Sequence, residues 1–205
     1  MTELIDNNVK ELESQSSHDE ILPPPPYLDV DGLHIFEVHY KDWSSHTCVQ
    51  DDNGVTIFTG QRESMSSTLE VIDRNGNNVG KSRTSSLSTR IDVELFNMTA
   101  PAHTFEIRNH ATFGSPRYPS PTFGEQQMTW KNKMMSKKIQ FDLMDESGRV
   151  YAKFESAPKT KIGRLEITDS CFGEDWLKEV VVTLLTLLTR KLRNINDMPQ
   201  YGIIN

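Results

Sequence analysis

Residues Glu174–Arg193 read EDWLKEVVVTLLTLLTRKLR, and they decide the fold of this 205-residue chain. Their centre, Val180–Leu188, is apolar except for two threonines, whose hydroxyls can bond back to carbonyls of the same helix. A helix that is apolar on all sides is buried, and this centre is only about half of the roughly 20 residues needed to cross a bilayer. We therefore expect the helix inside the protein, with these side chains buried: Trp176, Leu177, Val180, Val181, Leu184, Leu185, Leu187 and Leu188.

The residues before the helix are patterned as short β-strands. Apolar and polar side chains alternate in Leu33–Tyr40 and Val55–Phe58, and Leu69–Ile72 runs into the turn residues Asp73–Gly76. Further strands are predicted at Ile91–Phe96, Thr104–Arg108, Gln127–Lys131, Ile139–Leu143, Val150–Glu155 and Lys161–Thr168. Roughly ten short strands, about 8–14 residues apart, are typical of a sandwich or a barrel.

The single apolar helix restricts the architecture further. A two-layer sheet would leave half of the helix in water, whereas a closed barrel around it buries every face and removes the sheet edges. The sequence therefore predicts a mainly β fold, a closed antiparallel barrel that encloses a hydrophobic C-terminal helix. Between the strands, the proline-containing segment Ala111–Gln126 is predicted as a long loop, and the turn glycines are Gly54, Gly60, Gly76 and Gly148.

Charge is distributed unevenly along the chain. The net charge is -7, and residues 1–30 hold seven acids against Lys10, which accounts for -6 of it. This polar segment is predicted to be a disordered acidic tail, and residues 31–205 to be the barrel domain. The first residues lack the apolar region of a signal peptide, so we expect a cytoplasmic protein, with peripheral membrane association left open.

The most specific functional motif is a proline-rich segment in the tail. Pro24, Pro25, Pro26 and Tyr27 form a PPxY motif. WW domains bind such ligands because the polyproline II helix is preformed, with prolines in one aromatic groove and the tyrosine in a second pocket. The alternative is a rigid linker that ends in a tyrosine. We expect a WW-domain partner, such as a HECT-type ubiquitin ligase.

A second candidate site consists of basic residues in the last third of the chain. They could form a face for anionic lipid headgroups, to which each base near a membrane contributes on the order of 1 kcal/mol. The alternative is an ordinary solvated surface, because acids are interleaved among the bases. The candidate residues are Lys131, Lys133, Lys137, Lys138, Lys159, Lys161 and Arg164.

Catalytic and metal-binding patterns are not found in the sequence. The histidines lack metal-ligand spacing, and no serine lies in a nucleophile elbow. Cys48 and Cys171 are interpreted as thiols in a reducing compartment, although a disulfide stays open. We expect a monomer without enzymatic activity, metal or cofactor, and the negative charge argues against a nucleic-acid partner.

Several segments of the second half resemble one known family. They are FEIRNH (105–110), MTWKNK (128–133) with Trp130, IQFDLMDESGRVYAKFE (139–155), GRLEIT (163–168) and the terminal helix. Together they resemble the tubby C-terminal-like superfamily, which includes tubby proteins, phospholipid scramblases and plant LURP-one-related proteins. The closest likeness is to small fungal tubby-like proteins of unknown function.

The resemblance implies a barrel of about twelve strands around the helix. The basic pair that binds phosphoinositide in tubby proteins does not align here, and the cysteine-rich segment and membrane helix of scramblases are not found. We therefore expect a non-enzymatic adaptor or membrane-peripheral binding module with a WW-binding tail. The alternative is a phosphoinositide-binding or scramblase-like lipid-handling protein, and a weaker third is a barrel that binds a small apolar ligand.

Overall fold

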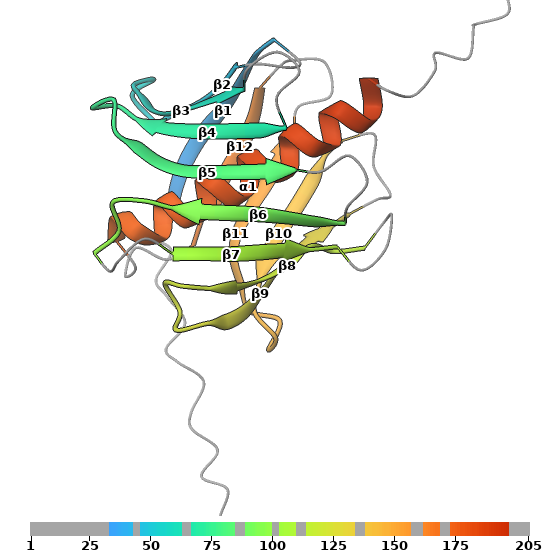
Figure 1. Ribbon diagram of the computed structural model, residues 1–205. Helices are drawn as coiled ribbons and strands as arrows, with labels where there is room; N and C mark the ends of the chain where they lie inside the picture. The colour runs from blue at the N-terminus through green and yellow to red at the C-terminus, as the bar shows by residue number, and fades with distance from the viewer. Residues whose placement is uncertain are drawn as a thin grey trace, which may run out of the picture.

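The computed structural model describes residues 33–42, 46–62, 67–84, 89–99, 103–109, 114–133, 138–156, 162–168 and 173–196. These residues form twelve strands and one helix (Figure 1). The strands are β1 (His34–Asp42), β2 (His46–Gln50), β3 (Thr56–Arg62), β4 (Thr68–Asp73), β5 (Asn78–Thr84), β6 (Arg90–Leu95), β7 (His103–Arg108), β8 (Arg117–Ser120), β9 (Gln126–Asn132), β10 (Gln140–Met144), β11 (Val150–Ser156) and β12 (Ile162–Ile167). The helix is α1 (Gly173–Asn196).

The twelve strands close into a single antiparallel barrel, as the sequence predicts. Each strand pairs with its neighbours in the chain, and β1 closes the ring by pairing with both β2 and β12. We call the end at which β1 and α1 begin the proximal end, and the opposite one the distal end. Because all neighbours are antiparallel, odd-numbered strands run from the proximal to the distal end and even-numbered strands run back.

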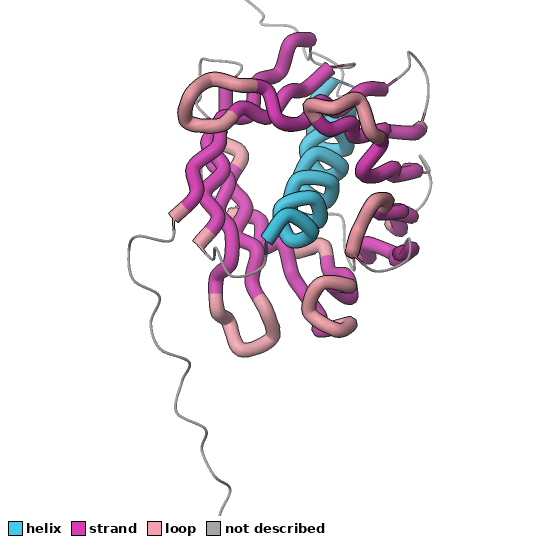
Figure 2. Tube along the Cα trace, turned by 90° about the vertical axis from the view of Figure 1, so that its left-hand side faces the viewer, coloured by secondary structure: helices cyan, strands magenta, loops and turns pink. Residues whose placement is uncertain are grey.

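The helix α1 lies inside the ring of strands (Figure 2). Every residue of Val180–Leu188 is buried, and Trp176 is 1% exposed, which confirms the predicted burial. Leu177 differs, because it is only partly buried and packs at the edge of the core. The core therefore consists of one helix and the inward-facing side chains of the strands around it.

The two threonines in the apolar centre connect the helix to the barrel wall. Thr183 donates a hydrogen bond to the Glu179 carbonyl at 2.8 Å and accepts one from Trp130 Nε1 at 3.1 Å. Thr186 bonds to the Val182 carbonyl at 2.7 Å and to the Ser82 hydroxyl at 2.9 Å. Their polar groups are thus satisfied inside the core, as burial requires.

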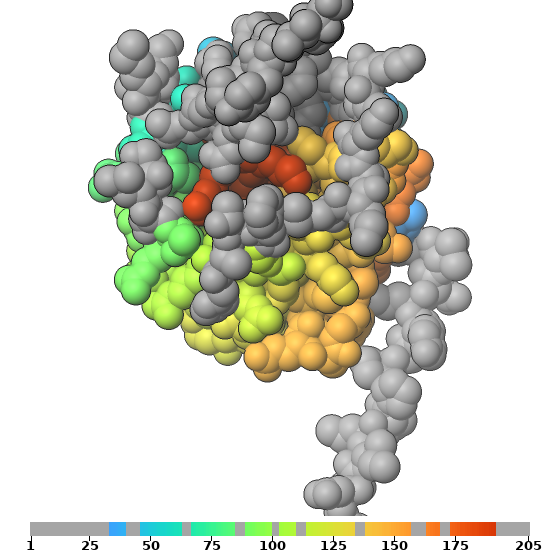
Figure 3. All heavy atoms as spheres, turned by 90° about the vertical axis from the view of Figure 1, so that its right-hand side faces the viewer, coloured from blue at the N-terminus to red at the C-terminus, as the bar shows by residue number. Residues whose placement is uncertain are grey.

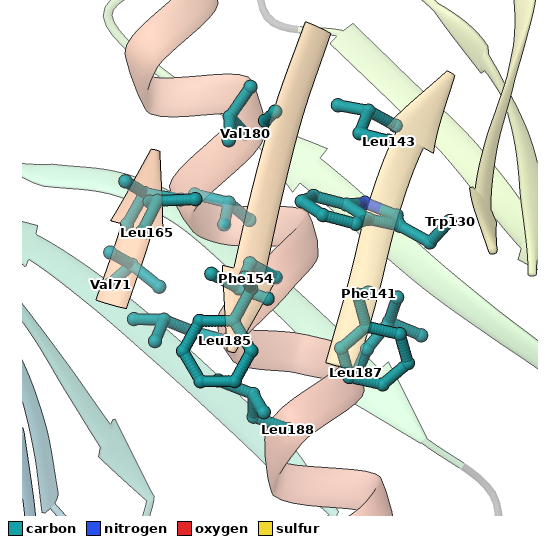
Figure 4. Packing of buried hydrophobic residues seen from close by; sticks show 14 of the residues in the cluster. Val71, Trp130, Phe141, Leu143, Phe154, Leu165, Val180, Leu185, Leu187 and Leu188 are labelled. Carbon is teal, nitrogen blue, oxygen red and sulfur yellow. The ribbon is translucent and has the colours of Figure 1, made fainter. Parts of the chain in front are cut away.

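The helix lies close to the wall formed by β4, β5 and β6. Gly60 of β3 and Gly80 of β5 make this approach possible, because a Cβ at Gly80 would lie 2.5 Å from Val182 Cγ2. Gly60 faces Leu185 from within a strand, so its prediction as a turn glycine is wrong. On the β9–β12 side, the larger space is filled by big side chains, among them Trp130 and Phe154 (Figure 4).

Three hairpin turns at the proximal end have the same construction. Asp51 and Asp73 each accept hydrogen bonds from the amides two and four residues later, at 2.8–3.0 Å. Asp145 accepts the Arg149 amide at 3.0 Å and the Ser147 hydroxyl at 2.6 Å. In each turn the glycine three residues after the aspartate has a positive φ, between 75° and 86°, where glycine is preferred. The turn prediction is confirmed at these three glycines.

Three strands were not predicted, and each has a physical reason. In β5 the residues that face the helix include Gly80 and Ser82, so the strand lacks apolar alternation. In β2 only Val49 is a buried apolar residue. β8 contains Pro119 and lies within the predicted loop Ala111–Gln126, so that loop prediction is wrong.

Candidate functional site

Although Arg74, Arg149 and Lys178 lie at the proximal end of the barrel, ten described lysines and arginines gather at the distal end. Each lies in the first two or last two residues of a strand there, in an adjoining turn, or near the end of α1. Figure 3 looks at this end and shows part of α1 at its centre. These residues are Arg62, Arg83, Arg90, Arg108, Arg117, Lys131, Lys133, Lys138, Arg190 and Lys191.

Acidic residues gather at the proximal end, in the hairpin turns and at the start of α1. They are Asp51, Asp52, Asp73, Glu125, Asp145, Glu146, Glu174 and Asp175. A helix macrodipole favours acids near its first turn and bases near its last turn, so both ends of the barrel match the direction of α1. The distal end therefore carries an excess of bases, and the proximal end an excess of acids.

Two contacts fix the start of α1 at the proximal end. Asp175 accepts the amide of Thr99 at 2.8 Å, and Lys178 donates to the Asn97 carbonyl at 2.8 Å. Burial alone would raise the pKa of Asp175, but the hydrogen bonds of Thr99 and the charge and hydrogen bond of Lys178 outweigh it, so this pKa is lowered. The start of the helix is thus held by the β6–β7 connection.

Four of the seven predicted lipid-binding residues are described, and three of them line one surface groove. Lys133, Lys138 and Arg164 lie around a groove of about 660 Å³ on the outer face of β1, β10, β11 and β12. Lys131 lies on the neighbouring strand β9, directly opposite Asp142. The other three candidates, Lys137, Lys159 and Lys161, fall outside the described residues.

Within this groove, bases and acids alternate from strand to strand. One row crosses the wall as Lys131, Asp142, Lys153 and Glu166, and the next row as Gln140, Glu155, Arg164 and Glu37. Ion pairs join Lys133 to Asp142 (2.6 Å), Arg164 to Glu166 (3.1 Å) and Lys138 to Glu155. An anionic ligand on this wall would have to compete with these carboxylates.

A buried polar cluster lies beneath the β8–β9 turn. The Glu179 side chain of α1 is fully buried and accepts the Thr122 amide at 3.1 Å, with the Ser120 and Tyr118 hydroxyls also next to it. Burial raises the pKa of Glu179. Burial, and then the charge of Glu179, also raises the pKa of Tyr118, whose ring stacks on Phe105 at 5.2 Å. This cluster joins the turn to the helix.

Several predictions concern residues that the structure does not describe. Pro24, Pro25, Pro26 and Tyr27 lie outside the described residues, and so does Cys171. Cys48 is half-buried in β2 with a free thiol. Among the described residues, no three His, Cys, Asp or Glu side chains are grouped so that they could hold a metal ion. The described part of the chain contains no helix that is long and apolar enough to span a membrane.

The fold is similar to a solved structure from a plant. The X-ray structure of the Arabidopsis thaliana protein AT5G01750 superimposes with a TM-score of 0.51 and 13% sequence identity, and the match covers 80% of this chain and 92% of that chain. No protein-family model and no curated protein matches the sequence. At this identity the likeness establishes the fold alone.

The arginines near the ends of β3, β5, β6, β7 and β8 were not among the predicted site residues. Arg62, Arg83, Arg90, Arg108 and Arg117 each lie within two residues of a strand end, at the distal side. Their positions along the sequence do carry a signal. In an antiparallel barrel, every second connection between strands lies at the same end, and each of these arginines lies next to such a connection. That signal requires the number and order of the strands, which were only partly predicted.

Proposed function

We propose that this protein is a non-enzymatic adaptor, in which the tail recruits a WW-domain protein and the barrel presents a second binding surface. The filled barrel is the observation that carries the proposal. Because α1 and its packed neighbours occupy the interior, binding is left to the outer surface and the tail. We further propose that the barrel is a tubby C-terminal-like domain, which a closed twelve-strand barrel around a C-terminal helix supports.

The position of the proline-rich segment supports a role as a ligand. β1 begins at His34 and is paired on both edges, by β2 and β12, so closure of the barrel does not require residues before it. Pro24–Tyr27 precede this strand in an acidic tail. We propose that a HECT-type ubiquitin ligase is the partner and that the complex forms in the cytoplasm.

The test is binding of the full-length chain to a purified WW domain from a HECT-type ubiquitin ligase. Tyr27→Ala and Pro25→Ala should each weaken binding at least about tenfold, because each empties one of the two ligand pockets. Pro26→Ala is the matched control, since it keeps the PPxY pattern. Equal recovery of the WW domain by the wild type and the Tyr27→Ala variant would show that the segment is only a linker.

The distal end favours a second candidate, a lipid-binding role like that of phosphoinositide-binding or scramblase-like proteins. A base near an anionic surface contributes on the order of 1 kcal/mol, and several bases are gathered there. Flotation with vesicles that contain phosphoinositide should then show binding that falls with salt. Arg62→Glu combined with Arg83→Glu should abolish it, whereas Arg74→Glu at the proximal end should not. Salt-insensitive or absent flotation would count against this role.

A further inference from the structure

The seam between β7 and β8 is the least paired part of the barrel wall. The two strands share one residue pair, Arg108↔Arg117, whereas all other neighbouring strands share four to six. This pair lies at the distal end, and Figure 1 shows β7 and β8 diverging from there toward the proximal end. Within the described residues, no backbone pairing between the strands continues along Thr104–Ile107 and Tyr118–Ser120. Among the described residues, the seam is therefore the stretch of the wall with the shortest strand-to-strand ladder.

A groove of about 400 Å³ lies over this seam on the outer surface. It is lined by Glu106 and Arg108 from β7, Arg117, Tyr118 and Pro119 from β8, Gln127 from β9, and Glu146. The stacked rings of Phe105 and Tyr118 close the seam on the inner side, so the groove opens only outward. Its direction follows the strands, from the arginines at the distal end to Glu146 at the proximal end.

Three arginines lie in register at the distal end of the groove. Arg90, Arg108 and Arg117 are direct cross-strand partners on β6, β7 and β8, and all three are exposed. Like charges placed directly opposite one another destabilise a sheet. Glu106 is shared between Arg108 (2.9 Å) and Arg90 (3.9 Å), and no described acid forms an ion pair with Arg117. The row therefore places three positive charges beside one carboxylate, which favours the approach of a further carboxylate to Arg117.

We propose that this groove binds an extended acidic peptide segment of a partner protein, whose backbone follows the seam and whose carboxylates contact Arg108 and Arg117. Peptides that add to a sheet gain affinity from main-chain hydrogen bonds and specificity from alternate side chains. The recessed groove suits an extended chain better than a flat bilayer. Glu146 at the other end sets the direction, because it repels acids there. The inference rests on the adaptor function, since it gives the barrel the second ligand that an adaptor requires.

The test uses the full-length protein and a fluorescein-labelled hexapeptide in which glutamate alternates with valine. Fluorescence anisotropy should show saturable binding, and a hexapeptide with glutamine in place of glutamate should bind at least about tenfold more weakly. Methylation of alternate backbone nitrogens should also weaken binding, because it removes main-chain donors. Equal affinity for the glutamate and glutamine peptides, or no saturable binding of either, would overturn the proposal.

Variants of the barrel complete the test. Arg117→Ala should weaken peptide binding by about tenfold, the loss expected for one charge-assisted hydrogen bond. Arg83→Ala is the matched control, an exposed distal arginine on β5 outside the groove. Equal peptide affinity for these two variants would refute the placement of the site. The proposal would also be refuted if Arg117 were needed for binding to phosphatidylserine vesicles and the peptide did not bind. Tyr27→Ala should leave peptide binding intact and Arg117→Ala should leave WW binding intact, so the two functions fail separately.

Discussion

The close approach of α1 to β5 predicts a specific steric conflict. In Gly80→Ala the new Cβ would lie 2.5 and 2.9 Å from the two Cγ atoms of Val182, and 3.3 Å from the Glu94 carbonyl oxygen. Val182 cannot easily rotate away, because a β-branched side chain in a helix has one strongly preferred rotamer. The barrel wall or the helix must therefore move.

The cost of this conflict follows from two opposing effects. Overpacking of a core costs about 1–3 kcal/mol, whereas replacing glycine by alanine returns about 0.4–1 kcal/mol by restricting the unfolded chain. We expect a net loss of about 1–2 kcal/mol in the free energy of unfolding, or about 2–8 °C in Tm. Gly60→Ala is a graded comparison, since its nearest contact is the flexible end of Leu185 at 3.1 Å, and its effect should be smaller.

A double-mutant cycle tests the contact itself. Val182→Ala removes both methyl groups that the new Cβ would strike, at a cost of its own, so adding Gly80→Ala to the Val182→Ala variant should cost little further stability. The coupling should reach about 1–2 kcal/mol in urea unfolding followed by tryptophan fluorescence. Strict additivity of the two substitutions would mean that α1 does not touch β5 at this point, and the packing described above would be wrong.

Three other perturbations test the core and the turns. Leu185→Asp places a charge in the fully buried centre of α1, and loss of cooperative unfolding by calorimetry is expected, whereas a cooperatively folding variant would contradict the burial of the helix. Burial raises the pKa of Glu179 above its ordinary 4.5, so the folded protein holds this proton more tightly than the unfolded chain. The free energy of unfolding is therefore highest below about pH 4.5 and falls as pH rises through the folded-state pKa. Glu179→Gln should therefore gain stability over the wild type as pH rises from about 4.5 to 8, and a pH-independent difference would contradict this. Asp145→Ala should destabilise by about 1–3 kcal/mol, since it leaves the buried Tyr151 hydroxyl without its acceptor at 3.0 Å, and Asp51→Ala in an exposed turn should cost less in the same urea titration.

The helix and the barrel could be predicted because their signals are local. The apolar centre of α1 excludes a surface position. In β10 and β11, apolar and polar residues alternate over Gln140–Leu143 and Ala152–Glu155, with an Asp-x-x-Gly turn between the strands. β5 could not be found in this way, because the residues that face α1 there are small. A strand that packs closely against a helix has glycine and serine at inward-facing positions. A strand farther from the helix has larger residues, such as valine or leucine, at those positions.

The candidate sites depend on information that is not local. Lys133 pairs with Asp142 of the next strand, and Arg164 lies opposite Glu155 and Glu37 on the two strands beside it, so these neighbours follow from strand register. The arginine row depends on register across β6, β7 and β8, and β8 was assigned to a loop. The basic candidates could be chosen from the sequence, but the carboxylates that lie beside them are determined by how the strands pair in the closed barrel.

The order of elements along the chain has a consequence for biosynthesis. All twelve strands leave the ribosome before α1, so the inner faces that will surround the helix are made before the core that covers them. Contacts such as Thr186 with Ser82 join residues 104 positions apart, and such distant contacts slow folding. Until α1 arrives, a nascent barrel exposes apolar strand faces of the kind that aggregate or bind chaperones. The core of the barrel can therefore form only after α1 has been translated.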